Sequence, residues 1–296
     1  MKIHDVFYKF PWGLQFLCFV LISAGCLIVS ANAGSLLSVL IFGRDAFYQT
    51  PSLLVVQGIS ITGGFLLPAL WLARMKQAAR TDYLQCRNGV SFQPLLLAIA
   101  GYLLLSPFIA VVQEWNAAWH FPASWNGIEM YFRNKTAFSE QISRQMLHVQ
   151  SSGLFICAFI VVAVGAGVCE EFFFRGGLQN LVREKVRNTH AAIWITAAIF
   201  SLFHIDLFGF FPRLFLGALL GYLYVWSESI WLPVLVHTLN NGILALLHFL
   251  YFNGRISLDP QNLEQAPGWP YVALSMIGFI VICFAAGKIK RWQTEQ

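Results

Sequence analysis

Long apolar segments alternate with short polar ones along the whole chain. A helix of about 20 apolar residues crosses a hydrocarbon layer about 30 Å thick. Segments that meet or approach this length cover residues 13–32, 52–73, 94–113, 152–175, 190–209, 211–227, 230–252 and 270–287. The pattern therefore predicts an all-α, polytopic membrane protein with about eight transmembrane helices.

Composition supports this fold class. Charged residues make up 11% of the chain, against roughly 25% in an average soluble domain. The six cysteines show no paired spacing, and five of them lie within apolar segments, so we expect buried thiols rather than a disulfide framework. No soluble domain and no internal repeat stand out in the sequence.

The distribution of lysine and arginine between alternate loops predicts the orientation, because positive loops tend to stay in the cytoplasm. With the N-terminus inside, the cytoplasmic side holds Lys2, Lys9, Arg74, Lys76, Arg80, Arg87, Arg183, Lys185, Arg187, Lys288, Lys290 and Arg291. The opposite side holds Arg44, Arg133, Lys135, Arg144, Arg213 and Arg255. We therefore expect both termini in the cytoplasm. The net charge of +5 is mostly this topological signal and gives no reason to propose nucleic acid as a partner.

The chain divides into three predicted parts. Residues 1–150 hold the first three helices and an outer segment, 151–252 hold helices four to seven, and 253–296 hold the last helix and a basic tail. The alternative interpretation of the first span is a cleavable signal peptide that ends at residues 31–33. Within the outer segment, apolar residues from Ile128 to Met146 recur at helical spacing, which predicts an amphipathic surface helix. It is either a connecting segment or a lid.

Two glycines four residues apart, Gly217 and Gly221, lie in the predicted sixth span. Small residues at this spacing let helix backbones approach closely. We expect them to pack inside the bundle, with a dimer face as the alternative.

The stretch CEEFFFRGG, residues 169–177, places three charges where the pattern predicts a membrane helix. A charge near the bilayer centre costs several kcal/mol unless it is paired or functional. Positions four apart share one helix face, so Glu171 and Arg175 are expected to pair and to leave Glu170 free for chemistry. The alternative is that all three belong to a helix end at the membrane surface.

Two further polar groups lie on other spans, in FSLFH (200–204) and HTLNN (237–241). The helical rise puts Glu170 about 20 Å from the boundary at Arg183, and His204 about 20 Å from the start of its helix. It puts His237 and Asn241 about 11 to 17 Å into theirs. These four groups are therefore expected to meet in one layer inside the membrane.

Their chemistry suits hydrolysis. A buried carboxylate beside a histidine can activate water, and we expect Glu170 and His204 to form this pair. Asn241 and His237 are expected to donate to an oxyanion that develops on a carbonyl. Zinc is the rival use of Glu170, His204 and His237, although the sequence contains no HExxH.

These motifs resemble those of the CPBP family, the CAAX protease and bacteriocin-processing family also called Abi. EEFFFRG matches its EExxxR motif, FSLFH its FxxxH motif and HTLNN its HxxxN motif, and the resemblance covers about 150–252. It implies an intramembrane endopeptidase with Glu170 as the base, His204 as its partner, and His237 and Asn241 at the oxyanion.

The resemblance also has consequences for the supporting residues and the cofactor. Glu171, Arg175 and Phe200 match supporting motif positions. Family members are commonly labelled metalloproteases, but the same motifs have been interpreted as a metal-free glutamate protease. We expect no cofactor, with a divalent metal such as zinc as the alternative.

The predicted function is hydrolysis of a peptide bond in a membrane-associated peptide or protein, in the lipid bilayer of a bacterial inner membrane. One alternative is a non-proteolytic immunity or scaffold member of the same family. Another is a proton-coupled transporter in which Glu170 and His204 relay protons. Transporters usually show repeated halves or broken helices, and the sequence shows neither.

Overall fold

The computed structural model describes residues 7–76, 82–257, 259–260 and 266–294. Helices account for 84% of it, and the described ranges contain no strand, which confirms the all-α prediction. Within these ranges seven helices are long and apolar enough to cross a membrane, and a shorter apolar helix covers Thr189–Phe203. Of the basic residues that predict the orientation, Lys2 and Arg80 lie outside the described residues.

Helices cover all the predicted apolar segments, and α6 (Asn126–Leu147) lies outside them. They are α2 (Trp12–Phe42), α3 (Thr50–Ile61), α4 (Leu67–Lys76), α5 (Phe92–Ala117), α6 (Asn126–Leu147), α7 (Ser152–Phe159), α8 (Ala166–Glu171), α9 (Asn180–Val186), α10 (Thr189–Phe203), α11 (Phe210–Ser227), α12 (Trp231–Phe252) and α13 (Trp269–Thr294). Short π-helical stretches at Thr62–Leu66, Ile160–Gly165 and Phe172–Gln179 join α3 to α4 and make α7, α8 and α9 one continuous rod.

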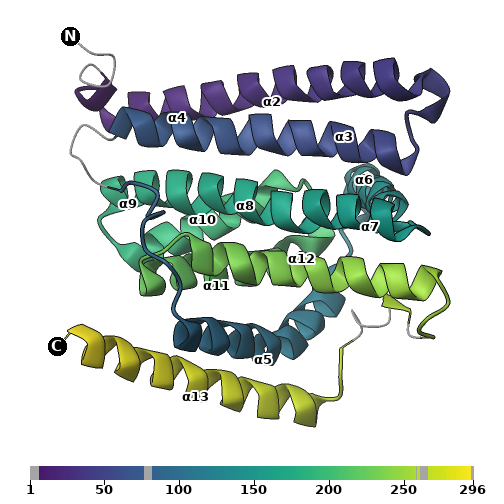
Figure 1. Cartoon of the computed structure of the whole chain (residues 1–296). Helices are drawn as coiled ribbons and strands as arrows, with labels where there is room; N and C mark the ends of the chain where they lie inside the picture. The colour runs from purple at the N-terminus through teal and green to yellow at the C-terminus, as the bar shows by residue number, and fades with distance from the viewer. Residues whose placement is uncertain (1–6, 77–81, 258, 261–265, 295–296) are drawn as a thin grey trace.

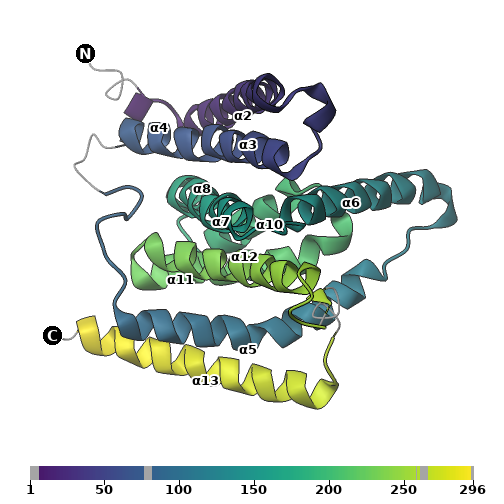
Figure 2. The same cartoon turned by 45° about the vertical axis from the view of Figure 1, so that its right-hand side comes forward.

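The helices form three layers (Figure 1). On one side α2 packs along α3 and α4, and on the other side α5 pairs with α13. The rod of α7 to α9 lies between them with α10, α11 and α12, as a second view also shows (Figure 2). This central layer carries all three sequence motifs, so the outer pairs shield the polar groups from lipid.

The structure corrects the predicted end of the fifth span. The apolar pattern extends this span to residue 209, but α10 ends at Phe203. Its 15 residues rise about 22 Å, which is less than the roughly 30 Å of a hydrocarbon layer. A turn and a 3₁₀ helix at Leu207–Gly209 follow, because Asp206 accepts a hydrogen bond from the Phe208 amide and starts the new element. His204 therefore lies at a helix end and not within a span.

The predicted amphipathic helix is confirmed as α6, which lies at the opposite end of the bundle from α9 (Figure 1). Apolar side chains on it, including Tyr131 and Phe138, are exposed. Its first turn is tied down by Glu129, which accepts hydrogen bonds from the Phe121 amide and from Arg133.

The glycine pair of α11 packs inside the bundle, as predicted. A Cβ on Gly217 would lie 3.3 Å from that of Ala197, and one on Gly221 would lie 2.9 Å from the Ile193 side chain. Both neighbours belong to α10. These two positions are therefore occupied by internal packing and do not form a dimer face.

Candidate active site

The centre of the site is the buried carboxylate of Glu171, whose Oε1 accepts hydrogen bonds from an arginine and a histidine. Arg175 Nη1 donates to Glu171 Oε1 over 2.7 Å, and both side chains are fully buried. This is the pair that the four-residue spacing predicts. His237 Nδ1 lies 2.7 Å from the same Glu171 oxygen. The structure thus gives Glu171 a second partner, which the sequence analysis did not assign to it.

The bond to Glu171 fixes the tautomer and direction of His237. An ionised carboxylate only accepts hydrogen bonds, so His237 Nδ1 must carry the proton that it donates. The second ring nitrogen then points away from Glu171, and Nε2 lies 3.9 Å from Glu170 Oε2. Glu170 keeps 15% of its side chain exposed whereas Glu171 keeps none. The two adjacent carboxylates therefore occupy different environments, and Glu170 is the accessible one.

Arg175 has partners on several sides, although its buried Nε donates to no acceptor among the described residues. Besides Glu171, its Nη2 donates to the Gly217 carbonyl over 2.9 Å, and its guanidinium lies 4.9 Å from the centre of the Phe200 ring. A Cβ on Gly217 would meet Phe200 and Ala197 of α10, so the missing side chain lets α11 pack closely against α10 beside the guanidinium. The sequence indicates the close approach at this glycine, but it does not indicate that the carbonyl serves as an acceptor.

Another glycine brings α12 onto α8. A Cβ on Gly167 would lie 2.5 Å from Thr238 Oγ1 and 3.1 Å from the Thr238 amide nitrogen. Because Thr238 follows His237 directly, this contact sets the distance between the helix that carries His237 and the helix that carries Glu171.

His204 shares an aromatic neighbour with His237. The Phe200 ring contacts the His204 ring at 5.1 Å and the His237 ring at 6.2 Å between centroids. His204 Nδ1 lies 3.0 Å from the Phe200 carbonyl. A carbonyl only accepts, so Nδ1 donates and leaves Nε2 free. His204 is exposed, and neither a hydrogen bond nor an ion pair links it directly to Glu170.

Asn241 lies one helical turn beyond His237, and part of its hydrogen-bonding capacity is already used. Its Nδ2 donates to the Val162 carbonyl over 3.2 Å, and its Oδ1 accepts from Asn240 over 2.9 Å. Asn240 in turn accepts from the Tyr102 hydroxyl over 2.8 Å. An amide nitrogen has two hydrogens, so Asn241 keeps one donor beyond the bond to Val162. Asn240 and Tyr102 carry no sequence signal that separates them from ordinary packing.

The loop beside His204 contains a charged pair of its own. Arg213 Nη1 lies 2.7 Å from Asp206 Oδ2. Burial alone would raise the pKa of Asp206, but the Arg213 charge and the hydrogen bond from Thr136 bring it below its ordinary value. Asp206 is therefore a carboxylate at neutral pH.

The residues do not fit a protein metal centre as they are placed. A catalytic zinc normally takes three protein ligands, and no three histidine, cysteine, aspartate or glutamate side chains among the described residues converge in that way.

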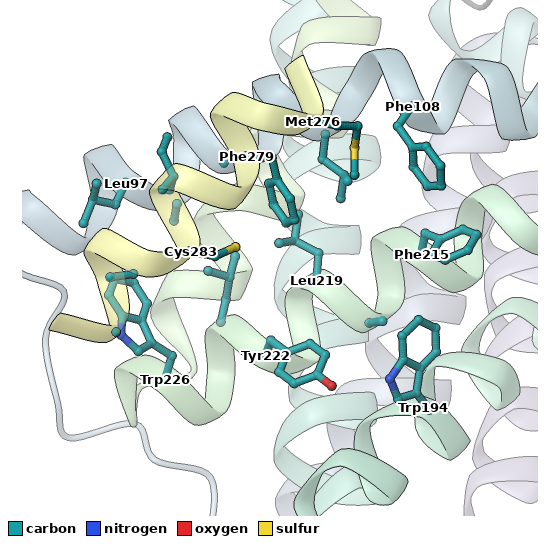
Figure 3. Close-up of a pocket in the computed structure, with 18 residues that line it drawn as sticks. Leu97, Phe108, Trp194, Phe215, Leu219, Tyr222, Trp226, Met276, Phe279 and Cys283 are labelled. Atoms are coloured by element: carbon teal, nitrogen blue, oxygen red, sulfur yellow. The ribbon is translucent and has the colours of Figure 1, made fainter. Parts of the chain in front are cut away.

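A large cavity lies apart from these residues. It measures about 600 Å³, is bounded by α5, α11 and α13, and is lined almost entirely by apolar side chains such as Phe108, Leu219 and Phe279 (Figure 3). None of the motif residues lines it. The chemistry is therefore to be sought in the central layer and not in this cavity.

Comparison with known proteins agrees with the motif resemblance. Residues 152–243 match the family model described as type II CAAX prenyl endopeptidase Rce1-like. The membrane-embedded CAAX protease MroQ of Staphylococcus aureus (strain USA300) is 31% identical over 117 residues, or 38% of this chain and 43% of that protein. The match thus spans less than half of this curated relative. No solved structure matches the chain significantly.

The matched segment contains Glu170, His204, His237 and Asn241. It coincides with the central layer, in which His237 lies beside Glu170, His204 and His237 contact the same Phe200 ring, and Asn241 lies one turn beyond His237 on α12. The chain is therefore an integral membrane protein whose segment 152–243 is similar to the CPBP/CAAX protease family.

Proposed function

We propose that this protein is an intramembrane endopeptidase that hydrolyses a peptide bond of a membrane-associated protein or peptide. The observation that carries this proposal is the difference in burial and hydrogen bonding between the two neighbouring carboxylates. Glu171 is buried and bonded to Arg175 and His237, whereas Glu170 is accessible and lies 3.9 Å from His237 Nε2. The family match supports the same reaction class.

Each side chain then has a role. Glu170 takes a proton from the attacking water as the water oxygen bonds to the carbonyl carbon. His204 receives this proton from Glu170 at its free Nε2 and delivers it to the leaving amine as the C–N bond breaks. The remaining Asn241 N–H stabilises the oxyanion. His237 donates to Glu171 from Nδ1, and when Nε2 is also protonated it donates to the oxyanion from Nε2.

A peptide-cleavage assay in detergent tests this function directly. Wild-type protein is compared with Glu170→Gln and His204→Ala on a panel of membrane-associated peptides, with products mapped by mass spectrometry. Loss of a general base or acid typically lowers the rate by about 10² to 10⁴, and we expect that loss in both variants. Full cleavage by Glu170→Gln would contradict the proposal. Absence of cleavage by wild type across the panel would support a non-proteolytic family member.

We further infer that the reaction needs no bound metal. The test is elemental analysis of active protein together with activity after exhaustive chelation, and we expect activity to persist. One zinc per chain, with activity lost on its removal and restored on its return, would show that Glu170, His204 and His237 are ligands.

The orientation is also a proposal. Both termini are expected to lie in the cytoplasm of a bacterial inner membrane, from the excess of lysine and arginine on one side. Reporter fusions at Thr136 on α6 and Lys185 on α9 should report the periplasmic and the cytoplasmic side, respectively. Reports from the same side would contradict the eight-span topology.

A further inference from the structure

The turn that follows His204 departs from ordinary backbone geometry. Ile205 has a φ of 51°, which is rare for a β-branched residue because its side chain clashes in the left-handed region. Such a conformation persists only where the surrounding structure holds it in place. The residue adjacent to the proposed proton-transfer histidine is therefore kept in a strained state.

Asp206 holds this turn from within. Its Oδ1 accepts hydrogen bonds from the Phe208 amide over 3.1 Å and from Thr136 Oγ1 over 2.8 Å, and its Oδ2 pairs with Arg213. A Cβ on Gly209 would lie 2.5 Å from both charged groups. The absent side chain at Gly209 thus leaves room for the ion pair across the turn.

Neighbouring helices hold the same turn from two sides. Asn116 at the end of α5 is fully buried, donates to the Leu207 carbonyl over 3.0 Å and accepts from the Phe211 amide over 3.0 Å. On α6, the Arg133 guanidinium lies 3.9 Å from the centre of the Phe208 ring. Non-helical backbone between membrane helices must find such partners inside the protein.

His204 depends on this arrangement. Its side chain makes one hydrogen bond among the described residues, from Nδ1 to the Phe200 carbonyl, and its ring contacts the Phe200 ring at 5.1 Å between centroids. The direction of Nε2 also depends on the backbone at residue 204, which leads directly into the strained turn at Ile205. The residues that hold the strained turn therefore also influence the direction of the His204 ring.

We propose that Asp206 is a positioning residue for His204 and that Thr136, on the outer helix α6, completes its hold. The inference rests on the proposed function, because it names what orients the proton-transfer histidine of that site. Asp206 acts through the backbone at Ile205 and not on the substrate. The outer helix α6 is then a part of the active-site framework and more than a connection.

Steady-state cleavage kinetics on matched variants test this role. Thr136→Val removes the hydroxyl at nearly constant shape, and Thr136→Ser keeps it. A misplacement of about 1 Å can lower the rate about 100-fold, so we expect Thr136→Val and Asp206→Asn to lower kcat about 10- to 100-fold with little change in KM. Thr136→Ser should stay near wild type. Glu140→Gln, in an exposed ion pair on the same helix, should leave both constants unchanged.

A chemical readout separates this inference from the proposed function. The rate of His204 modification by diethylpyrocarbonate is followed by mass spectrometry, with exposed His190 as the internal control. We expect Asp206→Asn and Thr136→Val to change the His204 rate several-fold and to leave the His190 rate unchanged, whether or not the protein cleaves peptides. Wild-type modification rates in both variants would overturn the positioning role. Wild-type kcat in both variants, alongside loss of cleavage in Glu170→Gln, would overturn it while leaving the proposed function intact.

Discussion

Two clusters of the same composition lie in different parts of this molecule. Each consists of a glutamate, an arginine four residues later and a histidine. In the outer cluster Glu129 Oε1 binds Arg133 over 2.8 Å and His120 over 2.9 Å. In the inner cluster one oxygen of Glu171 binds its arginine and its histidine, each over 2.7 Å.

The clusters differ in their access to water and in the second carboxylate oxygen. Arg133 and His120 are 37% and 77% exposed, whereas the inner arginine and histidine are 1% and 5% exposed. Glu129 Oε2 accepts from the Phe121 amide over 2.7 Å, but Glu171 Oε2 has no partner among the described residues. Water can replace a lost partner outside, and nothing nearby replaces one inside.

The comparison shows that the environment, and not the set of side chains, decides what a charge cluster does. Exposed ion pairs contribute little because water competes and side chains lose entropy. A buried pair contributes little net stability either, but breaking it leaves a charge without solvation. The inner cluster therefore acts as a rigid holder that directs His237 towards Glu170, and the outer cluster fixes the start of a surface helix.

The largest expected effect comes from breaking the inner cluster. Arg175→Ala leaves Glu171 buried and without its cation, which typically costs about 3 to 5 kcal/mol. We expect a large loss of membrane accumulation and a lower Tm in detergent. Arg133→Ala in the outer cluster should lower the Tm far less. Equal losses in the two variants would contradict the comparison.

A smaller effect is expected from the contact that lets α12 approach. Gly167→Ala places a methyl group against Thr238, and such overpacking typically costs about 1 to 3 kcal/mol. We expect a lower Tm together with reduced peptide cleavage, since His237 moves with α12. Gly153→Ala on the same rod is the control, because its Cβ meets nothing within 4 Å. A Gly167→Ala variant as stable and active as the control would refute the close-contact argument.

The contribution of the outer cluster to stability should depend on pH. The hydrogen bond from the Phe121 amide, followed by those from Arg133 and His120, lowers the pKa of Glu129 from 4.5 to about 2. Because the folded-state pKa is the lower one, the stabilisation is complete above the unfolded value and is lost as the pH falls towards 2. We expect the Tm of wild type to fall more steeply than that of Glu129→Gln between about pH 4.5 and 2. Parallel curves would contradict this.

The smallest effect is expected at an exposed pair on α6. Arg144 and Glu140 lie 3.6 Å apart with 49% and 59% of their side chains exposed, and such pairs contribute about 0 to 1 kcal/mol. Glu140→Gln should change the Tm only marginally in a thermal scan. A loss of Tm comparable with that of Arg175→Ala would show that solvent exposure does not distinguish the weak ion pairs from the strong ones.

The sequence predicts much of this architecture because lipid imposes a strong rule. Apolar length identifies the spans, and the four-residue spacing predicts the Glu171–Arg175 pair. Depth along each helix indicates that the histidines and Asn241 come together with Glu170. These inferences use only helical geometry and the cost of buried charge, which local sequence carries.

The remaining features depend on contacts between distant residues. The bond from His237 to Glu171 joins positions 66 apart, and no local pattern distinguishes Glu171 from Glu170 as its acceptor. The sequence does not predict the end of α10, because Leu207 and Phe208 continue the apolar pattern, while the turn is held by Asp206 with Thr136 on α6. The π-helical stretches around Glu170 likewise lack a sequence signal.

The most direct test of the account measures cleavage rate and Tm together for Glu170→Gln and Glu171→Gln. The account predicts opposite patterns from these neighbouring substitutions. Glu170→Gln should lose cleavage by about 10² to 10⁴ and keep the wild-type Tm, whereas Glu171→Gln should lose stability because Arg175 is left buried without its partner charge. If Glu170→Gln cleaves at the wild-type rate while Glu171→Gln is inactive and fully stable, the two carboxylates have been assigned the wrong roles.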